Sequence, residues 1–163
     1  MNLIDEFIEI LFISPGGGAS MLTSAYYRHA KVVFEFAMQS FATGSHFPVW
    51  GTCLGFETLM VLVAGDDKSI LGSCDTNDVS LALDFTPHAA SSRMFEGASS
   101  ELMSIMGKQE VTYNHHKHCI TNATYQSDAR LKNFFDVLAF NTDPEGVAFV
   151  STVEGEQDYD KIL

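Results

Sequence analysis

The chain has 163 residues, of which 46% are hydrophobic and 18% are charged, so it can bury a core and lacks the composition of a disordered protein. Its formal net charge of -12 repels phosphate backbones and anionic membrane surfaces, and we therefore expect neither nucleic acid nor a membrane as a partner. No apolar run approaches the roughly 20 residues that a membrane-spanning helix needs.

Two strand patterns and two helix patterns occupy the first part of the chain. β-branched and aromatic residues predict a buried strand over Phe7–Ile13, and a tight glycine-rich loop follows at Ser14–Gly18. Helical spacing predicts an amphipathic helix over Ser24–Phe41, with Ser24 as its N-cap and Gly44 beyond its end. The predicted apolar face of this helix consists of Val32, Val33, Phe36, Ala37, Ser40 and Phe41.

The second strand and the second helix flank Cys53. Phe47–Trp50 is a short apolar run that predicts a strand, and Phe56–Ala64 has the length and composition of a buried helix that ends at Gly65. Cys53 is therefore expected at a junction between a strand and a helix.

The rest of the chain is richer in strand patterns. Helices are predicted at Ser99–Gly107 and Ser127–Phe135. Strands are predicted at Ile70–Thr76, Asp78–Phe85, Val111–Ile120 (as a strand or a loop), Val137–Asn141 and Val147–Val153. Because strands and helices alternate early and strands cluster late, we expect a single α/β layered domain over residues 1–163, with a largely parallel sheet and an antiparallel extension.

The segment around Cys53 has the spacing of a nucleophile elbow. In Gly51-Thr52-Cys53-Leu54-Gly55 the small residues on either side allow a sharp turn that holds the thiol out from the end of a strand. A helix that begins after the cysteine directs N–H groups at the sulfur. The N–H of Leu54 is the natural first oxyanion donor, and Gly16 or Gly17 can supply the second. The alternative is a small buried cysteine between two glycines, with a purely structural role.

Three cysteines cannot all pair within one chain, so at least one thiol is free unless it pairs with a second chain. Cys74 and Cys119 are expected to be thiols of the core or the surface, and the pattern does not indicate a disulfide scaffold. His116 and His118 project from the same face of a predicted strand and could chelate a metal ion. We favour a histidine cluster without metal, because no nearby acid or cysteine completes a tetrahedral site.

The eleven residues of Phe47–Glu57 are similar to the nucleophile segment of the γ-glutamyl hydrolase family of cysteine peptidases, relatives of the class I glutamine amidotransferases. This resemblance covers almost the whole chain. The other matching segments are Ile10–Phe12, Pro15–Gly17, Gln39–Phe41, Ser92–Phe95, Asn114–Lys117, Leu131–Lys132, Phe134–Phe135, Asn141–Asp143, Phe149–Thr152 and Glu154–Gly155.

The resemblance implies a glutamine amidotransferase-like, flavodoxin-like layered sheet with helices on both faces, present here as an incomplete domain. It also implies a hydrolase that cleaves γ-glutamyl bonds in folate polyglutamates or other γ-glutamyl peptides through a thioester acyl-enzyme, with no cofactor. Carried over to this sequence, Cys53 is the nucleophile, Gly17 and Leu54 supply the oxyanion hole, and His116 contacts the substrate.

The resemblance also bears on compartment and assembly. Asn122-Ala123-Thr124 is an N-glycosylation sequon, at a place where such enzymes can carry glycan. This implies a lysosomal or secreted protein, and the family allows a homodimer. Asp5, Glu6 and Glu9 interrupt the apolar residues at the start of the sequence, so no signal peptide is expected in this chain.

The resemblance further implies that the chain is a piece of a longer enzyme, shortened at both ends. The family continues past Glu154–Gly155 into a Trp-His-Pro-Glu type motif, which supplies the general base and its orienting carboxylate, whereas this sequence has no histidine after His118. We therefore expect impaired hydrolysis, with His116 as the candidate to replace the base. The alternative is a noncatalytic homologue that binds glutamyl ligands or a partner.

Overall fold

The computed structural model describes residues 12–14, 16–45 and 47–155 of the chain. The chain forms two compact units, Met1–Lys68 and Ser69–Leu163, and each is described by itself. Most of the strand predicted over Phe7–Ile13, together with Pro15 and the acidic tail after Gly155, lies outside the described residues. The single domain over residues 1–163 stays a prediction.

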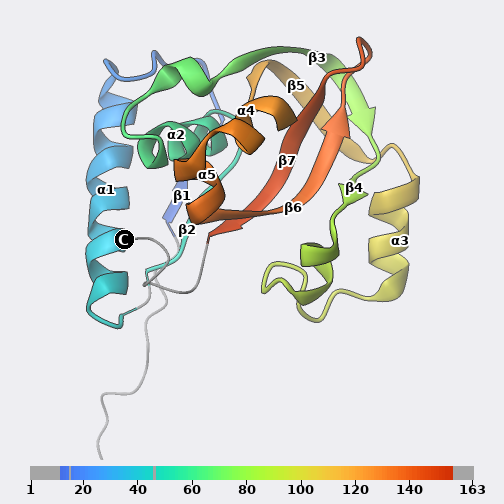
Figure 1. Ribbon diagram of the computed structural model, residues 1–163, viewed down its shortest axis with the longest axis horizontal. Helices are drawn as coiled ribbons and strands as arrows, with labels where there is room; N and C mark the ends of the chain where they lie inside the picture. The colour runs from blue at the N-terminus through green and yellow to red at the C-terminus, as the bar shows by residue number, and fades with distance from the viewer. Residues whose placement is uncertain (1–11, 15, 46, 156–163) are drawn as a thin grey trace, which may run out of the picture. The chain divides into compact units, whose positions relative to one another are not determined.

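The first unit is a strand-helix-strand-helix arrangement (Figure 1). Strand β1 (Phe12–Ser14) pairs in parallel with β2 (Val49–Gly51), so that Ser14 lies opposite Gly51. Helix α1 (Ala25–Ala42) connects the two strands, and α2 (Leu54–Val63) follows β2. Because the strands are parallel, the loop after β1 and the turn after β2 leave the sheet at the same edge.

Helix α1 begins where the sequence predicts, because the hydroxyl of Ser24 accepts a hydrogen bond from the N–H of Tyr27 at 3.1 Å. The predicted apolar face is partly wrong. Val32 and Phe36 are 64% and 53% exposed, whereas the buried side chains of α1 are Tyr27 and Ala30.

The reason is a polar contact that ties α1 to the chain just after α2. The hydroxyl of Tyr27 donates to Oδ1 of Asp66 at 2.7 Å, and Lys31 forms an ion pair with the same carboxylate. Lys31 and then Tyr27 hold the pKa of Asp66 below its ordinary value. This contact turns the Tyr27 side of α1 toward α2 and leaves Val32 and Phe36 on another side.

Helix α2 is the apolar centre of the first unit. It begins two residues earlier than predicted, directly after Cys53, and it ends just before Gly65, whose φ of 71° is readily adopted by glycine. Met60 and Val61 are fully buried.

The second unit contains two antiparallel sheets. Strand β3 (Gly72–Leu81) pairs with β5 (Thr112–Cys119). Strands β4 (Asp84–Phe85), β6 (Phe135–Thr142) and β7 (Ala148–Gly155) form a sheet in the order β4-β6-β7. The predicted antiparallel late strands are confirmed. Among the described strands, parallel pairing is confined to β1 and β2, so the largely parallel sheet is replaced by three small sheets.

Strand β3 continues through Asn77, where the sequence predicts a break between two strands. The pairing of β3 with β5 shifts register on both sides of Thr76, and Asp78 has a φ of 63°. These irregularities break the alternation of polar and apolar residues without ending the strand.

Short helices connect the strands of the second unit. They are the 3-10 helices Lys68–Ile70, at its boundary, and Pro87–Ser91, and the α-helices α3 (Ser100–Lys108), α4 (Asn122–Ser127) and α5 (Ala129–Phe134). Helix α3 begins directly after Ser99, whose hydroxyl caps it by accepting a hydrogen bond from the N–H of Leu102. The helix predicted over Ser127–Phe135 is observed as α5, which begins after Asp128, because the carboxylate of Asp128 accepts from the N–H of Arg130 and caps the helix.

The turn between β6 and β7 is held by one buried carboxylate. Asp143 accepts hydrogen bonds from the N–H groups of Glu145 at 3.0 Å and Val147 at 2.8 Å, and from the N–H of Asp75 in β3 at 3.0 Å. Burial acts to raise the pKa of Asp143, but these backbone donors outweigh it and hold the pKa below its ordinary value. Asp143 therefore joins the two sheets of the second unit.

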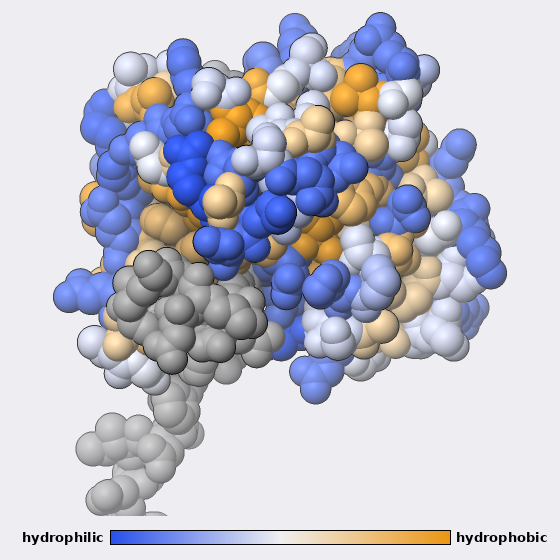
Figure 2. Space-filling view, viewed as in Figure 1, coloured by the Kyte–Doolittle hydropathy of each residue, from blue (hydrophilic) through white to orange (hydrophobic). Residues whose placement is uncertain are grey.

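The surface in view carries hydrophilic side chains interleaved with apolar ones (Figure 2). Among the described residues, no helix combines the length and the apolar composition that crossing a bilayer requires.

Candidate functional site

Cys53 occupies the turn between β2 and α2 that the sequence predicts. Its backbone has φ 56° and ψ -117°, a conformation that residues other than glycine rarely adopt. The carbonyl of Cys53 accepts from the N–H of Glu57 at 3.0 Å, while the N–H of Gly55 donates to the carbonyl of Thr52 at 2.9 Å. A strained residue between a strand and a helix is the geometry of a nucleophile elbow.

Gly51 has a steric role in this turn. A Cβ atom on Gly51 would lie 2.6 Å from the carbonyl oxygen of Gly55 and 2.8 Å from Cδ1 of Leu59. The backbone before the elbow therefore packs directly on the first turn of α2, and only glycine leaves room for this contact. The structural reason for a glycine at position 51 is thus a close approach of two backbone segments.

The loop after β1 lies against the cysteine. A Cβ atom on Gly16 would come within 2.9 Å of Cβ and 3.2 Å of Sγ of Cys53, and one on Gly17 would lie 3.9 Å from Cδ2 of Leu54. The structure therefore brings Cys53, Leu54, Gly16 and Gly17 together from two neighbouring loops. Gly16, which the sequence offers only as an alternative to Gly17, is the glycine that faces the sulfur.

The sulfur of Cys53 is a free thiol and the residue is partly exposed. Leu54, which follows it, is buried and begins α2, so its N–H belongs to the free first turn of a helix. Such N–H groups stabilise negative charge that develops next to them. A reachable thiol at a helix start, bordered by a glycine loop, has the parts required for nucleophilic attack on a carbonyl group.

The candidate substrate residue His116 lies on β5, in the second unit. It is half-buried, and burial, followed by the charge of His115, holds the pKa of its imidazole below the ordinary value. His116 is therefore neutral at neutral pH, with one nitrogen that donates and one that accepts. Its neighbours on the strand, His115 and His118, are exposed, and His115 stacks on Tyr113.

The metal alternative gains no support from this arrangement. Within residues 12–14, 16–45 and 47–155, no group of three or more histidine, cysteine, aspartate or glutamate side chains is placed to hold a metal ion.

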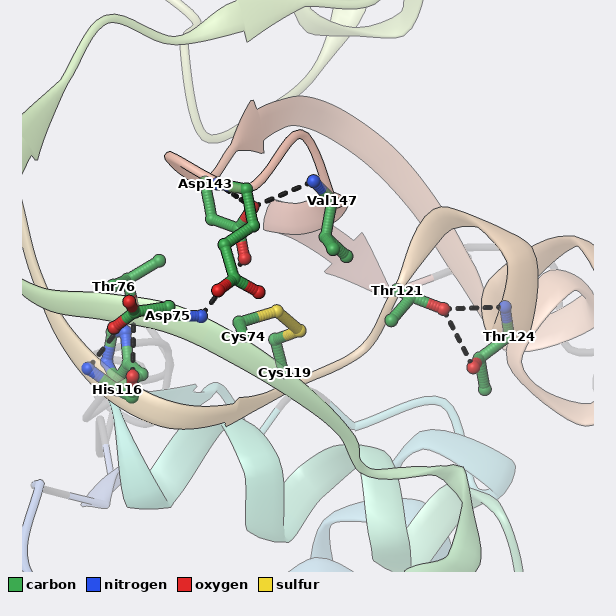
Figure 3. The surroundings of a disulfide bond; sticks show 10 residues. Cys74, Asp75, Thr76, His116, Cys119, Thr121, Thr124, Asp143 and Val147 are labelled. Atoms are coloured by element: carbon green, nitrogen blue, oxygen red, sulfur yellow. Dashed lines mark hydrogen bonds between the residues drawn. A yellow bond between two sulfur atoms is a disulfide. The ribbon is translucent and has the colours of Figure 1, made fainter.

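Cys74 and Cys119 are joined in a disulfide, which corrects the expectation that both are thiols (Figure 3). The bond connects β3 to β5 across a sequence separation of 45 residues, with a Cα–Cα distance of 5.9 Å. Both residues are buried and pack with Phe149, and Leu81 and Val147 adjoin them. The sequence does not reveal this pair, because the pairing depends on the register of two strands that are distant along the chain.

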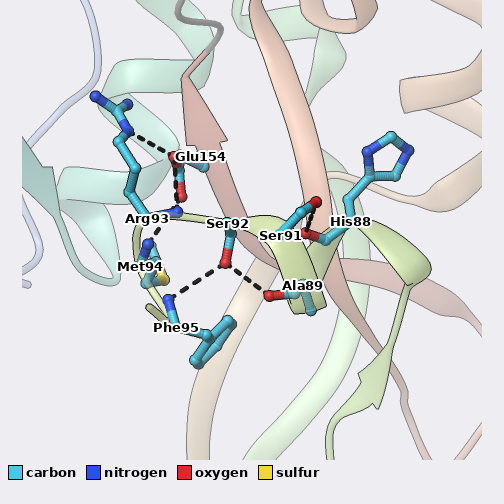
Figure 4. Close-up of polar contacts among 8 residues, drawn as sticks. All are labelled: His88, Ala89, Ser91, Ser92, Arg93, Met94, Phe95 and Glu154. Carbon is cyan, nitrogen blue, oxygen red and sulfur yellow. Dashed lines mark hydrogen bonds and ion pairs between the residues drawn. The ribbon is translucent and has the colours of Figure 1, made fainter. Parts of the chain in front are cut away.

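Glu154 connects two segments that carried the family resemblance (Figure 4). Its carboxylate accepts from the side chain of Arg93 at 2.8 Å and from the N–H of Met94 at 3.0 Å. Burial acts to raise the pKa of Glu154, but Arg93 and the N–H of Met94 outweigh it and lower the pKa. The sequence does not reveal this contact, although both partners lie in the matching segments.

Asn122, the sequon asparagine, is the first residue of α4. It is partly buried, and its Oδ1 is buried without a hydrogen-bond partner among the described residues. The sequon hydroxyl, Oγ1 of Thr124, lies 2.9 Å from Oγ1 of Thr121, the N-cap of this helix.

Comparison with known proteins finds relatives that are named γ-glutamyl hydrolase. A γ-glutamyl hydrolase of Mus musculus is 45% identical over 160 residues, which are 94% of this chain and 50% of that protein. The enzymes of Rattus norvegicus and Homo sapiens are 40% and 39% identical over 161 residues, which are 95% of this chain and 50% of each relative. No family model matches the chain.

The chain therefore spans about half the length of the curated relatives it matches. The mixed α/β fold of helices and small sheets agrees with the fold class predicted from the sequence. Over about 95% of its length this chain is similar to proteins that are named γ-glutamyl hydrolase.

Proposed function

We propose that this chain carries the nucleophile half of a cysteine hydrolase that cleaves γ-glutamyl bonds, with Cys53 as the nucleophile. The observation that carries the proposal is the backbone of Cys53, held at φ 56° between β2 and α2 with Gly16 against its sulfur. A strained backbone persists only where the surrounding structure enforces it, and such residues cluster at active sites. The names of the relatives supply the class of bond.

The chemistry follows the acyl-enzyme route of cysteine hydrolases. The thiolate of Cys53 attacks the carbonyl carbon of the γ-amide, and the carbonyl oxygen becomes an oxyanion next to the N–H groups of Leu54 and Gly17. The carbon–nitrogen bond then breaks, the amine leaves after taking up a proton, and a thioester remains on the sulfur. Water cleaves the thioester, which releases the γ-carboxylate and restores the thiol.

The proposed substrates are folate polyglutamates and other γ-glutamyl peptides, and His116 is the proposed contact to the glutamyl portion. A neutral imidazole offers one hydrogen-bond donor and one acceptor, which suits an amide group. The lowered pKa of His116 supports this assignment, because it keeps the imidazole neutral at neutral pH.

Incubation with a γ-glutamyl peptide tests the proposal. The purified chain, its Cys53→Ala variant and its Cys53→Ser variant would each be incubated with a folate polyglutamate, and the products separated by chromatography. We expect product from the wild type and a loss on the order of 10³-fold or more in both variants. Mass spectrometry should detect an acyl adduct on Cys53 that hydroxylamine removes.

The alternative is a noncatalytic homologue that binds glutamyl ligands or a partner through the same residues. It predicts equal, background-level product from the wild type and Cys53→Ala, together with slow alkylation of Cys53 near neutral pH. Fast, selective alkylation of Cys53 together with product formation would exclude this alternative.

We also propose a lysosomal or secreted location. The buried disulfide between Cys74 and Cys119 supports an oxidising compartment, where such bonds form and persist. The sequon at Asn122 supports the same compartment. Expression in a eukaryotic secretory system should give a glycoform that a peptide N-glycosidase converts to a faster-migrating band, and Asn122→Gln should abolish that shift. An unshifted wild-type band would reject glycosylation at this site.

A further inference from the structure

Thr76 and His116 lie opposite each other where β3 pairs with β5. The hydroxyl of Thr76 donates to the carbonyl oxygen of His116 at 3.1 Å, and the N–H of His116 donates to the same hydroxyl at 3.2 Å (Figure 3). Thr76 is fully buried. One side chain therefore binds both polar groups of the backbone at His116.

This contact occurs where the regular ladder of the two strands is interrupted. The register shifts between Ser73 and Thr76, and again between Thr76 and Val79. Backbone polar groups in a half-buried strand need partners, and an irregular ladder does not supply them in the usual way. The hydroxyl of a threonine can replace the missing hydrogen bonds between the strands, because it donates one hydrogen bond and accepts another.

Thr76 is also fixed from its own side. Cys74, two residues before it, is bonded to Cys119, three residues after His116. The N–H of Asp75 donates to the buried carboxylate of Asp143 at 3.0 Å. The segment around Thr76 is therefore held by a covalent bond and by the turn between β6 and β7, and it provides a rigid support for the opposite strand.

We propose that Thr76 is a positioning residue for His116, and that its hydroxyl sets the backbone from which the imidazole projects toward a glutamyl substrate. The inference rests on the role of His116 proposed above, and it adds a residue that does not itself touch the substrate. The burial that lowers the pKa of His116 supports the idea that the ring is held in one place.

Three variants of the full chain test this role. Thr76→Val keeps the shape of the side chain and removes both hydrogen bonds, whereas Thr76→Ser keeps the hydroxyl. Thr112→Val is the matched control, because the hydroxyl of Thr112 donates to the carbonyl of Leu81 on the same pair of strands, at 2.6 Å and away from His116.

The readouts are the titration of the His116 imidazole by NMR and the kinetics of γ-glutamyl hydrolysis. In Thr76→Val we expect the pKa of His116 to move up toward its ordinary value, and KM to rise about tenfold with kcat little changed. Thr76→Ser should restore both values, and Thr112→Val should alter neither. The titration of His115, followed in the same spectra, serves as an internal reference, because His115 is the neighbouring charge that acts on His116.

The proposal is overturned if Thr76→Val leaves the titration of His116 and KM unchanged, whatever happens to its melting temperature. Should Thr76→Val fail to fold, hydrogen exchange in the wild type decides. We expect the amide of His116 to be protected by its bond to Thr76, and exchange at the rate of an unprotected amide would overturn the proposal.

A His116→Ala variant separates failure of this inference from failure of the proposed function. If KM rises in His116→Ala and Thr76→Val has no effect, the positioning role alone is rejected. An unchanged KM in His116→Ala rejects the role of His116 in substrate binding. The effect of Thr76 on substrate binding is then rejected as well, even where Thr76→Val shifts the titration of His116.

Discussion

Gly16 lies against Cys53, so that a methyl group added to Gly16 would come within 3.2 Å of the sulfur and 2.9 Å of Cβ. Cβ is bonded directly to the backbone of the elbow and cannot swing away. The glycine loop after β1 is therefore fitted to the cysteine, and its shape and the position of the thiol depend on each other.

This relationship predicts that Gly16→Ala displaces the loop or the sulfur. The added Cβ atom would meet the side chain of Cys53 at 2.9 Å, so the effect of the substitution is steric. We expect alkylation of Cys53 to slow, and kcat/KM for γ-glutamyl hydrolysis to fall roughly 10- to 100-fold, since small misplacements of reacting groups are costly.

Gly18→Ala is the control for this experiment, because a Cβ atom there meets no atom of the described residues within 4 Å. It should behave like the wild type in both assays. Equal rates for Gly16→Ala and Gly18→Ala would show that the loop does not shape the nucleophile.

The contact of Gly51 with α2 predicts a loss of stability rather than of reactivity alone. In Gly51→Ala the new Cβ would lie 2.6 Å from the carbonyl oxygen of Gly55, and neither backbone segment can yield. We expect a decrease in the free energy of unfolding of roughly 1–3 kcal/mol, as is typical of overpacking, measured by thermal or denaturant unfolding.

Gly155→Ala is a matched comparison for Gly51→Ala. Gly155 also ends a strand, but among the described residues the nearest contact of its added Cβ is an ordinary 3.6 Å to the ring of Phe134. Stability should change little in this variant. A loss as large as that of Gly51→Ala would indicate a general cost of alanine at strand ends and would remove the steric argument.

The sequence predicts the elements around Cys53 well because their signals are local. A cap at Ser24 and glycines at Gly44 and Gly65 define helix ends through the backbone of a few residues. The elbow is equally local, since Gly51, Cys53 and Gly55 span one turn. The family resemblance then assigns chemistry to a position that spacing had already indicated.

Features that depend on pairing between distant segments were not predicted. The disulfide joins residues 45 apart, and Asp143 binds the N–H of Asp75 from another sheet. The predicted break at Asn77 failed for the same reason, because a strand that shifts register keeps its pairing while losing its alternation.

The burial of α1 was mispredicted through a polar contact. Hydrophobic periodicity placed Val32 and Phe36 on the buried face, yet the bond from Tyr27 to Asp66 orients the helix differently. A tyrosine on a helix and an aspartate after the next helix carry no signal in the sequence that they will meet.

The disulfide predicts a specific count of reactive thiols. The chain has three cysteines, and Cys53 is the free one, so the unfolded, unreduced protein should react with one equivalent of a thiol reagent and the reduced protein with three. Detection of three thiols before reduction, in protein prepared under oxidising conditions, would refute the pairing of Cys74 with Cys119.

Removal of the disulfide should destabilise the second unit. The double variant Cys74→Ala/Cys119→Ala loses a cross-link over 45 residues, and we expect the free energy of unfolding to fall by about 2–4 kcal/mol. Cys53→Ala removes a partly exposed thiol outside that cross-link and is the control. Equal melting temperatures for the double variant and the control would show that the bond contributes nothing to stability.

The carboxylate of Asp143 predicts how stability depends on pH. Its pKa is lowered in the folded protein, because backbone N–H groups from Val147, Asp75 and Glu145 outweigh the effect of burial. The folded state therefore binds this proton less readily than the unfolded state, whose aspartate titrates near pH 3.9, by the reference value. The stabilisation is present in full above that pH and is lost as the pH falls through the lower pKa of the folded state.

Asp143→Asn should accordingly lower stability near neutral pH by about 1–3 kcal/mol, because it weakens an acceptor shared by several buried donors. The difference from the wild type should shrink below about pH 4, where protonation of Asp143 removes the same charge. Glu145→Gln, an exposed change in the same turn that keeps the backbone N–H, is the control. A difference between Asp143→Asn and the wild type that stays constant from pH 7 to pH 3 would contradict the linkage, because the charge of Asp143 would then contribute nothing.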